Sequence, residues 1–372
     1  MARILTGIQS TGTPHLGNVL GAIAPAIEMS NHPSNEAYLF IANFHTLTQI
    51  KNAEEIRNNT YSVAAAWLAC GLNVNKVIFY RQSDVPQTAE LAWYLSCFFP
   101  YQRLTLAHSF KDKADRLEDV NAGLFSYPML MAADILLHKG VKVPVGKDQE
   151  QHLEMARTFG NRFNRLYNVE YFPEPQAFNY NQNLVKVPGL TGQGKMSKSA
   201  GEADSIYMSD SEEVMRRKVM KAVTAIVDGP TEPGSEKPLP IQNLFDLMGL
   251  VCTSDVIQKY EADYYDGSIR FGDLKKQLAD DMNGFLDPFR SRINDVLADE
   301  ALLSKVAKLG AEKASESANK TKELKEQCRK EYKEKIMIKP MSQHKFAELF
   351  AKKHKLGTFA VEKWLNGVKE NM

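Results

Sequence analysis

The chain has only four cysteines among its 372 residues: Cys70, Cys97, Cys252 and Cys328. Their spacings fit no metal-binding motif, and they are too sparse for a disulfide framework. Sparse, reduced thiols are typical of cytosolic proteins, so we expect a cytoplasmic location. A signal peptide, a transit segment and an apolar run of transmembrane length are also lacking, which predicts no membrane association.

A strong net charge is absent as well, since 46 Lys and Arg stand against 45 Asp and Glu. The charge is nevertheless uneven, because residues 320–372 hold 14 basic and 7 acidic side chains, a net charge of +7. Such a basic segment could contact nucleic acid. A solvated helical face or tail is an equally good explanation of its charge. With 44% hydrophobic residues the chain is long enough for a large core and two domains.

Both common nucleotide motifs, G-x-G-x-x-G and the Walker A loop, are missing from the first βα turn. Residues 3–9 nevertheless read as a buried strand, residues 10–14 as a turn and residues 15–29 as an apolar helix. A strand, a turn and a helix N-terminus form an anion site, because free N–H groups face the ligand. The residues placed there are Gln9, Ser10, Thr11, His15, Gly17 and Asn18.

A second stretch that suits phosphate is Gly-Lys-Met-Ser-Lys-Ser at residues 194–199. It places Lys195 and Lys198 three apart on a glycine-rich loop, and two ammonium groups on such a loop match the charge of a polyphosphate. A solvated surface loop is the alternative for this stretch on its own. A second phosphate-handling element at the N-terminus favours the first interpretation.

These residues carry a resemblance. Residues 14–18 resemble the HIGH motif of class I aminoacyl-tRNA synthetases, and residues 195–199 form a KMSKS motif. Residues 123–136 and 143–157 are similar to bacterial-type tryptophanyl-tRNA synthetases, and the likeness extends from about residue 2 to about residue 335. The last stretch, residues 336–372, lies beyond it.

The resemblance implies a tryptophan–tRNA ligase that uses ATP with Mg²⁺ and has L-tryptophan and tRNA(Trp) as partners, acting as a homodimer. No protein-bound metal is expected. The implied catalytic residues are His15, Lys113, Lys195 and Lys198. The implied ATP contacts are Gln9, Ser10, Thr11, Gly17, Asn18, Gly146, Lys147, Asp148, Val187, Met196 and Ser197. Ser109 and Lys147 depart from the usual Gln and Glu of the family.

The amino-acid pocket is predicted from helical spacing. Tyr127, Met131 and Asp134 share one face of a helix, and Asp134 offers an acceptor for the single N–H of an indole. The alternative is that Asp134 caps a helix or pairs with a distant basic group. The other expected tryptophan contacts are Leu5, Gly7, Val145 and Gln149. A tyrosyl enzyme, or a synthetase-like binding or regulatory protein, stays open.

The fold class is predicted as α/β: a Rossmann-like parallel sheet followed by an all-α region. Strands are expected at residues 3–9, 36–41, 76–84, 141–145 and 184–187. We predict a catalytic domain over residues 1–207 with a helical insertion at about 86–140. The resemblance implies a helical anticodon-binding domain over 208–335, and we expect a helical extension over 336–372 after it.

Overall fold

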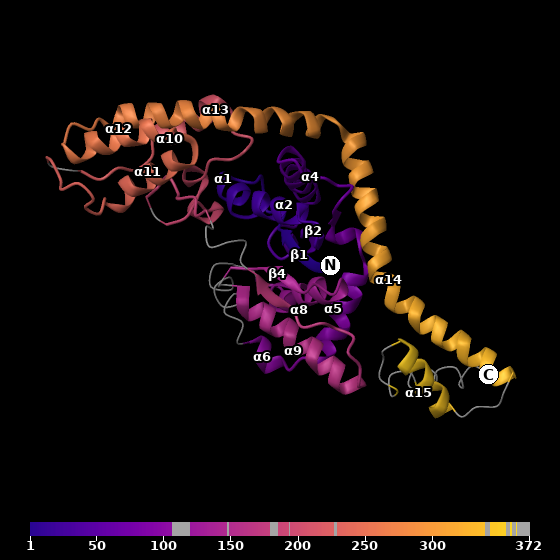
Figure 1. Cartoon of the computed structure of the whole chain (residues 1–372). Coiled ribbons are helices and arrows are strands. Elements are labelled where there is room, and N and C mark those ends of the chain that lie inside the picture. The colour runs from indigo at the N-terminus through magenta and orange to yellow at the C-terminus, as the bar shows by residue number, and fades with distance from the viewer. Residues whose placement is uncertain are drawn as a thin grey trace.

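A five-stranded parallel sheet lies at the centre of the computed structural model, in the order β3-β2-β1-β4-β5. The structure describes residues 1–105, 120–146, 149–178, 185–192, 194–226, 229–338, 343–354, 358 and 362. The strands are β1 (Ala2–Ile8), β2 (Asn35–Ile41), β3 (Ile78–Arg81), β4 (Lys142–Pro144) and β5 (Gln176–Phe178). The predicted Rossmann-like sheet is confirmed (Figure 1).

Strand β2 shows why this sheet forms, because both of its faces are buried. Ala37, Leu39 and Ile41 belong to the apolar cluster that contains helix α4 (Ala53–Ala69). Tyr38 and Phe40 belong to the other cluster, with helices α8 (Ala122–Leu137) and α9 (Glu150–Tyr167). A near-continuous apolar run is typical of a parallel strand covered on both sides.

The strand order reverses between β1 and β4. The chain moves outward from β1 to β2 and β3, then returns to form β4 and β5 on the other side of β1. Ligands of open parallel sheets bind at the carboxyl ends of the strands beside such a reversal. The crevice is therefore expected next to Gly7 and Val145.

Two predicted elements differ in the structure. The fifth strand was expected at residues 184–187, but β5 is Gln176–Phe178, and the described residues 185–187 lie outside any strand. This edge strand is only three residues long and mostly exposed, so it lacks the apolar run that marks a buried strand. The first helix is also interrupted: a π-helical turn, η1 (Val19–Ile23), separates α1 (Leu16–Asn18) from α2 (Ala24–Asn31). Pro25 has no N–H for an α-helical bond at this point.

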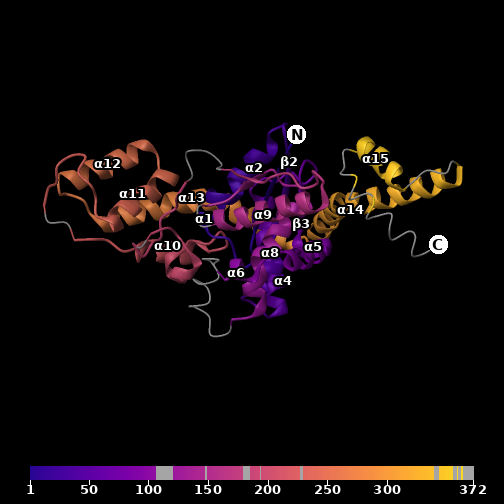
Figure 2. The same ribbon diagram turned by 90° about the horizontal axis from the view of Figure 1, so that it is seen from below.

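The C-terminal half is helical, as predicted. Its helices are α10 (Glu212–Met220), α11 (Leu239–Val251), α12 (Ser254–Tyr265), α13 (Phe271–Ala298), α14 (Glu300–Ile338) and α15 (Gln343–His354). Figure 1 shows α13 running from the α10–α12 group across the molecule, and α14 turning down beside the sheet. Helix α15 lies at the end opposite the α10–α12 group in Figure 2. None of the described helices is long and apolar enough to cross a membrane.

Helix α14 packs against the edge strand β3. Lys313 Nζ donates to the carbonyl oxygens of Val74 (3.2 Å) and Asn75 (3.3 Å). The Tyr38 hydroxyl donates to Ser317 Oγ at 3.0 Å. At Gly310 the helix backbone approaches the carbonyl of Phe79 so closely that a Cβ has no room. The helix therefore covers an edge that is otherwise free to pair with another strand. The predicted domain boundaries stay predictions.

Candidate functional site

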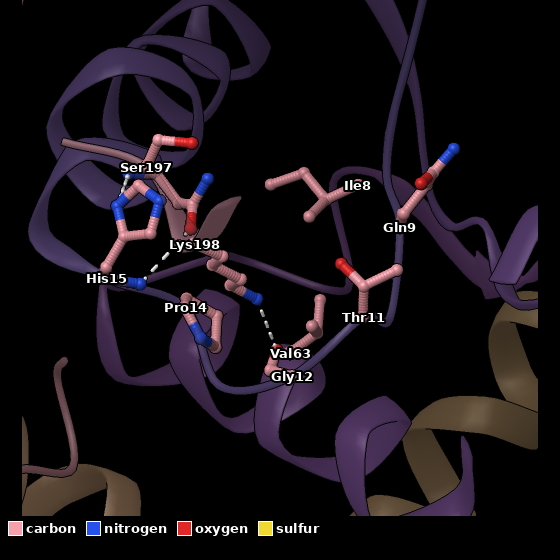
Figure 3. Close-up of a pocket in the computed structure, with 10 residues that line it drawn as sticks. Ile8, Gln9, Thr11, Gly12, Pro14, His15, Val63, Ser197 and Lys198 are labelled. Atoms are coloured by element: carbon pink, nitrogen blue, oxygen red, sulfur yellow. Dashed lines mark hydrogen bonds between the residues drawn. The ribbon is translucent and has the colours of Figure 1, made fainter. Parts of the chain in front are cut away.

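A cavity of about 260 Å³ lies where β1 ends and the chain turns into the first helix (Figure 3). Two residues of the 194–199 motif, Ser197 and Lys198, also line it. Six predicted residues line this cavity together: Gln9, Thr11, His15, Asn18, Ser197 and Lys198. Segments far apart in the sequence thus form one site with several N–H and O–H donors. Below, this space is named the phosphate cavity.

His15 is the N-cap of the first helix. The backbone N–H of Asn18 donates to His15 Nδ1 at 3.2 Å, and the backbone N–H of His15 donates to Asn18 Oδ1 at 3.1 Å. Since Nδ1 accepts, the ring proton of neutral His15 resides on Nε2. Burial, helped by the charge of Lys198, lowers the pKa of His15 to about 4. At neutral pH the ring is therefore an uncharged donor.

Lys198 is the lysine that faces the phosphate cavity. Its Nζ donates to the carbonyl oxygen of Gly12 at 2.9 Å, as the dashed line in Figure 3 shows. Burial lowers the pKa of Lys198 to about 8. Gly12 has φ +122°, and a Cβ there would lie 3.4 Å from Lys198 Nζ. Lys195 is exposed and does not line the cavity in this conformation.

A second cavity, of about 400 Å³, opens between the carboxyl ends of β1 and β4. It is named the apolar cavity here. Seven residues of the predicted amino-acid pocket line it: Leu5, Gly7, Tyr127, Met131, Asp134, Val145 and Gln149. Gly146, expected to contact ATP, lines it too. Gln9 lines both cavities, so the two spaces adjoin at this residue.

Asp134 is 2% exposed and is held by two residues that the sequence did not single out. Gln82 Nε2 donates to its two oxygens at 2.8 and 2.9 Å, and His45 Nε2 lies 2.9 Å from Oδ2. The alternative interpretation, that Asp134 pairs with a basic group distant in sequence, is thus correct in part, since His45 is such a partner. Burial raises the pKa of Asp134, and His45 and Gln82 oppose this shift. A carboxylate has about four acceptor positions, so one remains for a ligand N–H.

Comparison with known proteins decides the family. A family model described as tRNA synthetases class I (W and Y) matches residues 1–287. A tryptophan–tRNA ligase of Porphyromonas gingivalis is 47% identical over 322 residues, which cover 86% of this chain and 97% of the relative.

The chain belongs to the tryptophanyl-tRNA synthetase family. A solved tryptophanyl-tRNA synthetase of Campylobacter jejuni, complexed with ADP and tryptophan, has a TM-score of 0.77. It is 34% identical, and the match covers 87% of this chain and 99% of that one. A tyrosyl-tRNA synthetase of Aeropyrum pernix is 19% identical with a TM-score of 0.59, over 86% of this chain and 90% of that one, which shows the fold alone.

Some residues that were predicted to contact ATP lie outside both cavities of this synthetase. The Ser10 hydroxyl lies 2.9 Å from Thr46 Oγ1, so it points away from the phosphate cavity. Val187 and Met196 are buried, and the N–H of Met196 donates to the carbonyl of Val187 at 2.8 Å. Gly17 packs beside the His15 ring. Four residues lie outside the described part of the chain: Ser109, Lys113, Lys147 and Asp148.

Three residues around the site were missed. His45 and Gln82 follow the carboxyl ends of β2 and β3, so the rule for ligand sites in parallel sheets would have found them. Asp204 had no clear signal, because Glu202 in the same turn is also acidic and no local pattern shows which of the two carboxylates is buried.

Asp204 fixes the shape of the KMSKS loop. Its carboxylate is fully buried and accepts the N–H of Thr191 at 3.0 Å, the Thr191 hydroxyl at 2.5 Å and the N–H of Ser197 at 3.2 Å. Its Oδ1 and Oδ2 lie where a Cβ of residue 189 would be, so Gly189 leaves room for them. One side chain therefore bridges Thr191, before the motif, and Ser197, between Lys195 and Lys198.

Replacing Asp204 by alanine should lower pyrophosphate-exchange activity at least about tenfold. Each buried donor left without an acceptor costs about 1–3 kcal/mol, so the loop loses its fixed conformation. Steady-state exchange kinetics together with limited proteolysis of the loop measure the effect. Glu202→Ala, an exposed carboxylate in the same turn, is the matched control and should behave as the parent chain. Equal activity of both variants would contradict the role.

Proposed function

We propose that the chain activates L-tryptophan with ATP, forming tryptophanyl adenylate and pyrophosphate, and then transfers the tryptophanyl group to tRNA(Trp). The observation that carries this proposal is the meeting of the two cavities at Gln9. One cavity offers donors for phosphate, and the adjoining one offers an apolar slot with a buried acceptor. An amino acid in the apolar cavity would direct its carboxylate toward a nucleotide in the phosphate cavity.

The first step needs no protein nucleophile. The tryptophan carboxylate attacks the α-phosphorus of ATP, a new oxygen–phosphorus bond forms, and the bond to the β-phosphate breaks as pyrophosphate leaves. Mg²⁺ arrives with ATP as part of the substrate. Lys198 supplies a positive charge and His15 a neutral Nε2–H at the cavity wall, which stabilises charge on the phosphates. In the second step a terminal ribose hydroxyl of tRNA attacks the acyl carbon, and AMP leaves.

Selection of tryptophan is assigned to the apolar cavity. Leu5, Phe40, Met131 and Val143 supply apolar walls, and the remaining acceptor position of Asp134 takes the indole N–H. A carboxylate also accepts a phenol O–H, so the size of the slot must complete the choice against tyrosine.

Asp134→Asn should raise KM for tryptophan about 10- to 100-fold and change kcat much less. A hydrogen bond to a charged group is worth about 1.5–3 kcal/mol, and the amide that replaces the carboxylate would also face the donors of Gln82 and His45. Exchange kinetics at varied tryptophan concentration give both constants. Glu36→Gln, a half-buried carboxylate on β2 outside both cavities, is the control. An unchanged KM for the Asp134 variant would remove Asp134 from the pocket.

A homodimer is part of the proposal, and two exposed aromatic side chains support it. Trp93 on α5 (Gln87–Phe98) is 70% exposed and Tyr101 on α6 (Tyr101–Leu104) is 66% exposed. Exposed aromatic groups of this kind are enriched at subunit interfaces.

Light scattering should give twice the 41.8 kDa chain mass for the parent. Trp93→Glu with Tyr101→Glu should give a monomer, whereas Ile226→Glu, at a residue 90% exposed elsewhere, should not. A molar mass of one chain for the parent protein in light scattering would exclude the dimer.

The proposed function as a whole is tested by charging a tRNA(Trp) transcript with labelled tryptophan. Acid-stable label on the RNA is expected only with tryptophan, ATP and the transcript together. No charging by a chain that binds all three substrates would overturn the proposal. Anticodon recognition by residues 208–335 and a cytoplasmic location belong to the same proposal.

A further inference from the structure

A cleft of about 490 Å³ lies between α6 and α9, separate from both cavities described above. Three arginines line it: Arg103 from α6, and Arg162 and Arg165 from α9. Pro100, Thr158 and Asn161 complete its walls. The lining therefore contains guanidinium, hydroxyl and amide donors but no carboxylate. We name it the arginine cleft. Figure 1 shows α6 and α9 next to each other on the side of the sheet opposite α4.

The packing beneath the arginine cleft holds its walls in place. Phe99, just before α6, packs on Phe159 of α9 with ring centroids 4.7 Å apart. Leu104 at the end of α6 is buried in the same apolar cluster. The short helix that carries Arg103 is thus fixed against α9, and the arginines of the two walls face a common space without needing a ligand to order the backbone.

Ion pairs within the described part of the chain do not explain this arrangement. Among the described residues, no carboxylate lies within 4.0 Å of Arg103, Arg162 or Arg165, whereas Arg157 on the same helix pairs with Glu154 at 3.0 Å. Like charges at i and i+3 destabilise a helix by about 0.2–0.5 kcal/mol. Arg165 and Arg103 gain from the helix dipole in the last turns of α9 and α6, but Arg162 lies outside the last turn and has no such compensation.

The position relative to the apolar cavity points to the ligand. Helix α9 begins directly after Gln149, which lines that cavity. At 1.5 Å per residue, Thr158 lies about 12 Å and Arg165 about 22 Å further along the helix from Glu150. A tRNA whose 3′ end reaches the amino acid must continue its phosphate backbone away from the cavity over such distances.

We propose that the arginine cleft binds backbone phosphates of the tRNA behind its 3′ end, an inference that rests on the proposed function. Arg, Thr and Asn side chains are typical phosphate contacts, and phosphate contacts position an RNA without reading its sequence. A protein partner is the less favoured occupant, because the cleft lining itself contains no aromatic side chain, although Tyr101 of the proposed dimer interface is on the same short helix as Arg103. The cleft thus sets affinity for tRNA and not the choice of amino acid.

The test combines Arg103→Ala with Arg162→Ala, one change from each wall, in the full-length chain. Tryptophan-dependent pyrophosphate exchange needs no tRNA and should stay within about twofold of the parent. KM for a tRNA(Trp) transcript in aminoacylation should rise about 5- to 20-fold. In filter binding, the logarithm of the tRNA association constant is plotted against the logarithm of the salt concentration. The magnitude of this slope should fall by about 1–2, since each phosphate contact contributes about 0.7–0.9 to it. Arg57→Ala with Lys76→Ala, two exposed basic residues elsewhere, removes the same charge and should change neither value.

Unchanged tRNA affinity and salt slope, or equal effects in the control, would overturn the proposal. Loss of dimer mass in light scattering with an unchanged salt slope would assign the cleft to a second copy of the chain instead. Failure of the proposed function is distinguishable, because it would abolish exchange or charging in the parent chain, while filter binding of the transcript would still report on the cleft.

Discussion

Replacing Lys198 by alanine should lower tryptophan-dependent pyrophosphate exchange by about 10²–10³-fold while tryptophan affinity stays within about twofold. The ammonium group lies at the wall of the phosphate cavity, 2.9 Å from the Gly12 carbonyl, and no other described lysine lines that cavity. Loss of one preorganised group that stabilises developing charge typically costs about 2.7–4 kcal/mol. Single-turnover exchange kinetics separate the chemical step from tryptophan binding. Lys221→Ala, an exposed lysine after α10, is the control.

The pH dependence gives this prediction a second readout. Because burial lowers the pKa of Lys198 to about 8, the group loses its proton as pH rises through that value, and kcat/KM for ATP should fall there. Lys198→Arg keeps its charge and should lose this alkaline limb. His15, with a pKa of about 4, should contribute no limb between pH 5 and 8. A Lys198→Ala variant with equal losses in exchange rate and tryptophan affinity would contradict the assigned role.

Gly310→Ala should lower the free energy of unfolding by about 1–3 kcal/mol. The new Cβ would overlap the backbone carbonyl group of Phe79, which cannot rotate away as a side chain could. Helix α14 or strand β3 must therefore shift, and overpacking of this kind destabilises by such amounts. The contacts of Lys313 and Ser317 on the same helix would be strained with it.

Gly284→Ala on α13 is a matched control for this change. Residue 284 lies within the helix, and nothing lies within 4 Å of the Cβ position. Since Ala is favoured over Gly by about 1 kcal/mol in a helix, this variant should be slightly more stable than the parent. Thermal unfolding followed by circular dichroism compares the three chains. Equal midpoints for the two variants would show that α14 does not pack on β3 as described.

The sequence predicted those parts of the fold that have strong apolar patterns. Strand β2 forms where expected, because a buried apolar run is a local property of the chain. Strand β5 was misplaced because its position depends on pairing with β4, in the register Val143 to Ala177, and not on a pattern of its own. The packing of α14 on β3 is likewise a tertiary contact that local patterns do not reveal.

The same distinction holds for the site. Tyr127, Met131 and Asp134 were predicted together because they share one helix face, and all three line the apolar cavity. His45 and Gln82 reach Asp134 from two other elements, so no spacing in the sequence connects them. Which lysine of the KMSKS loop faces the phosphate cavity depends on the backbone of that loop, and therefore on buried Asp204.

The most direct test of the central claim is amino-acid-dependent ATP–pyrophosphate exchange, with each of the twenty amino acids supplied singly. Exchange with tryptophan alone is predicted, because the apolar cavity offers one buried acceptor within apolar walls and adjoins the phosphate cavity. Exchange with tyrosine would reassign Asp134 to a phenol partner. No exchange with any amino acid, in a chain that still binds ATP, would contradict the enzymatic account and favour a binding protein.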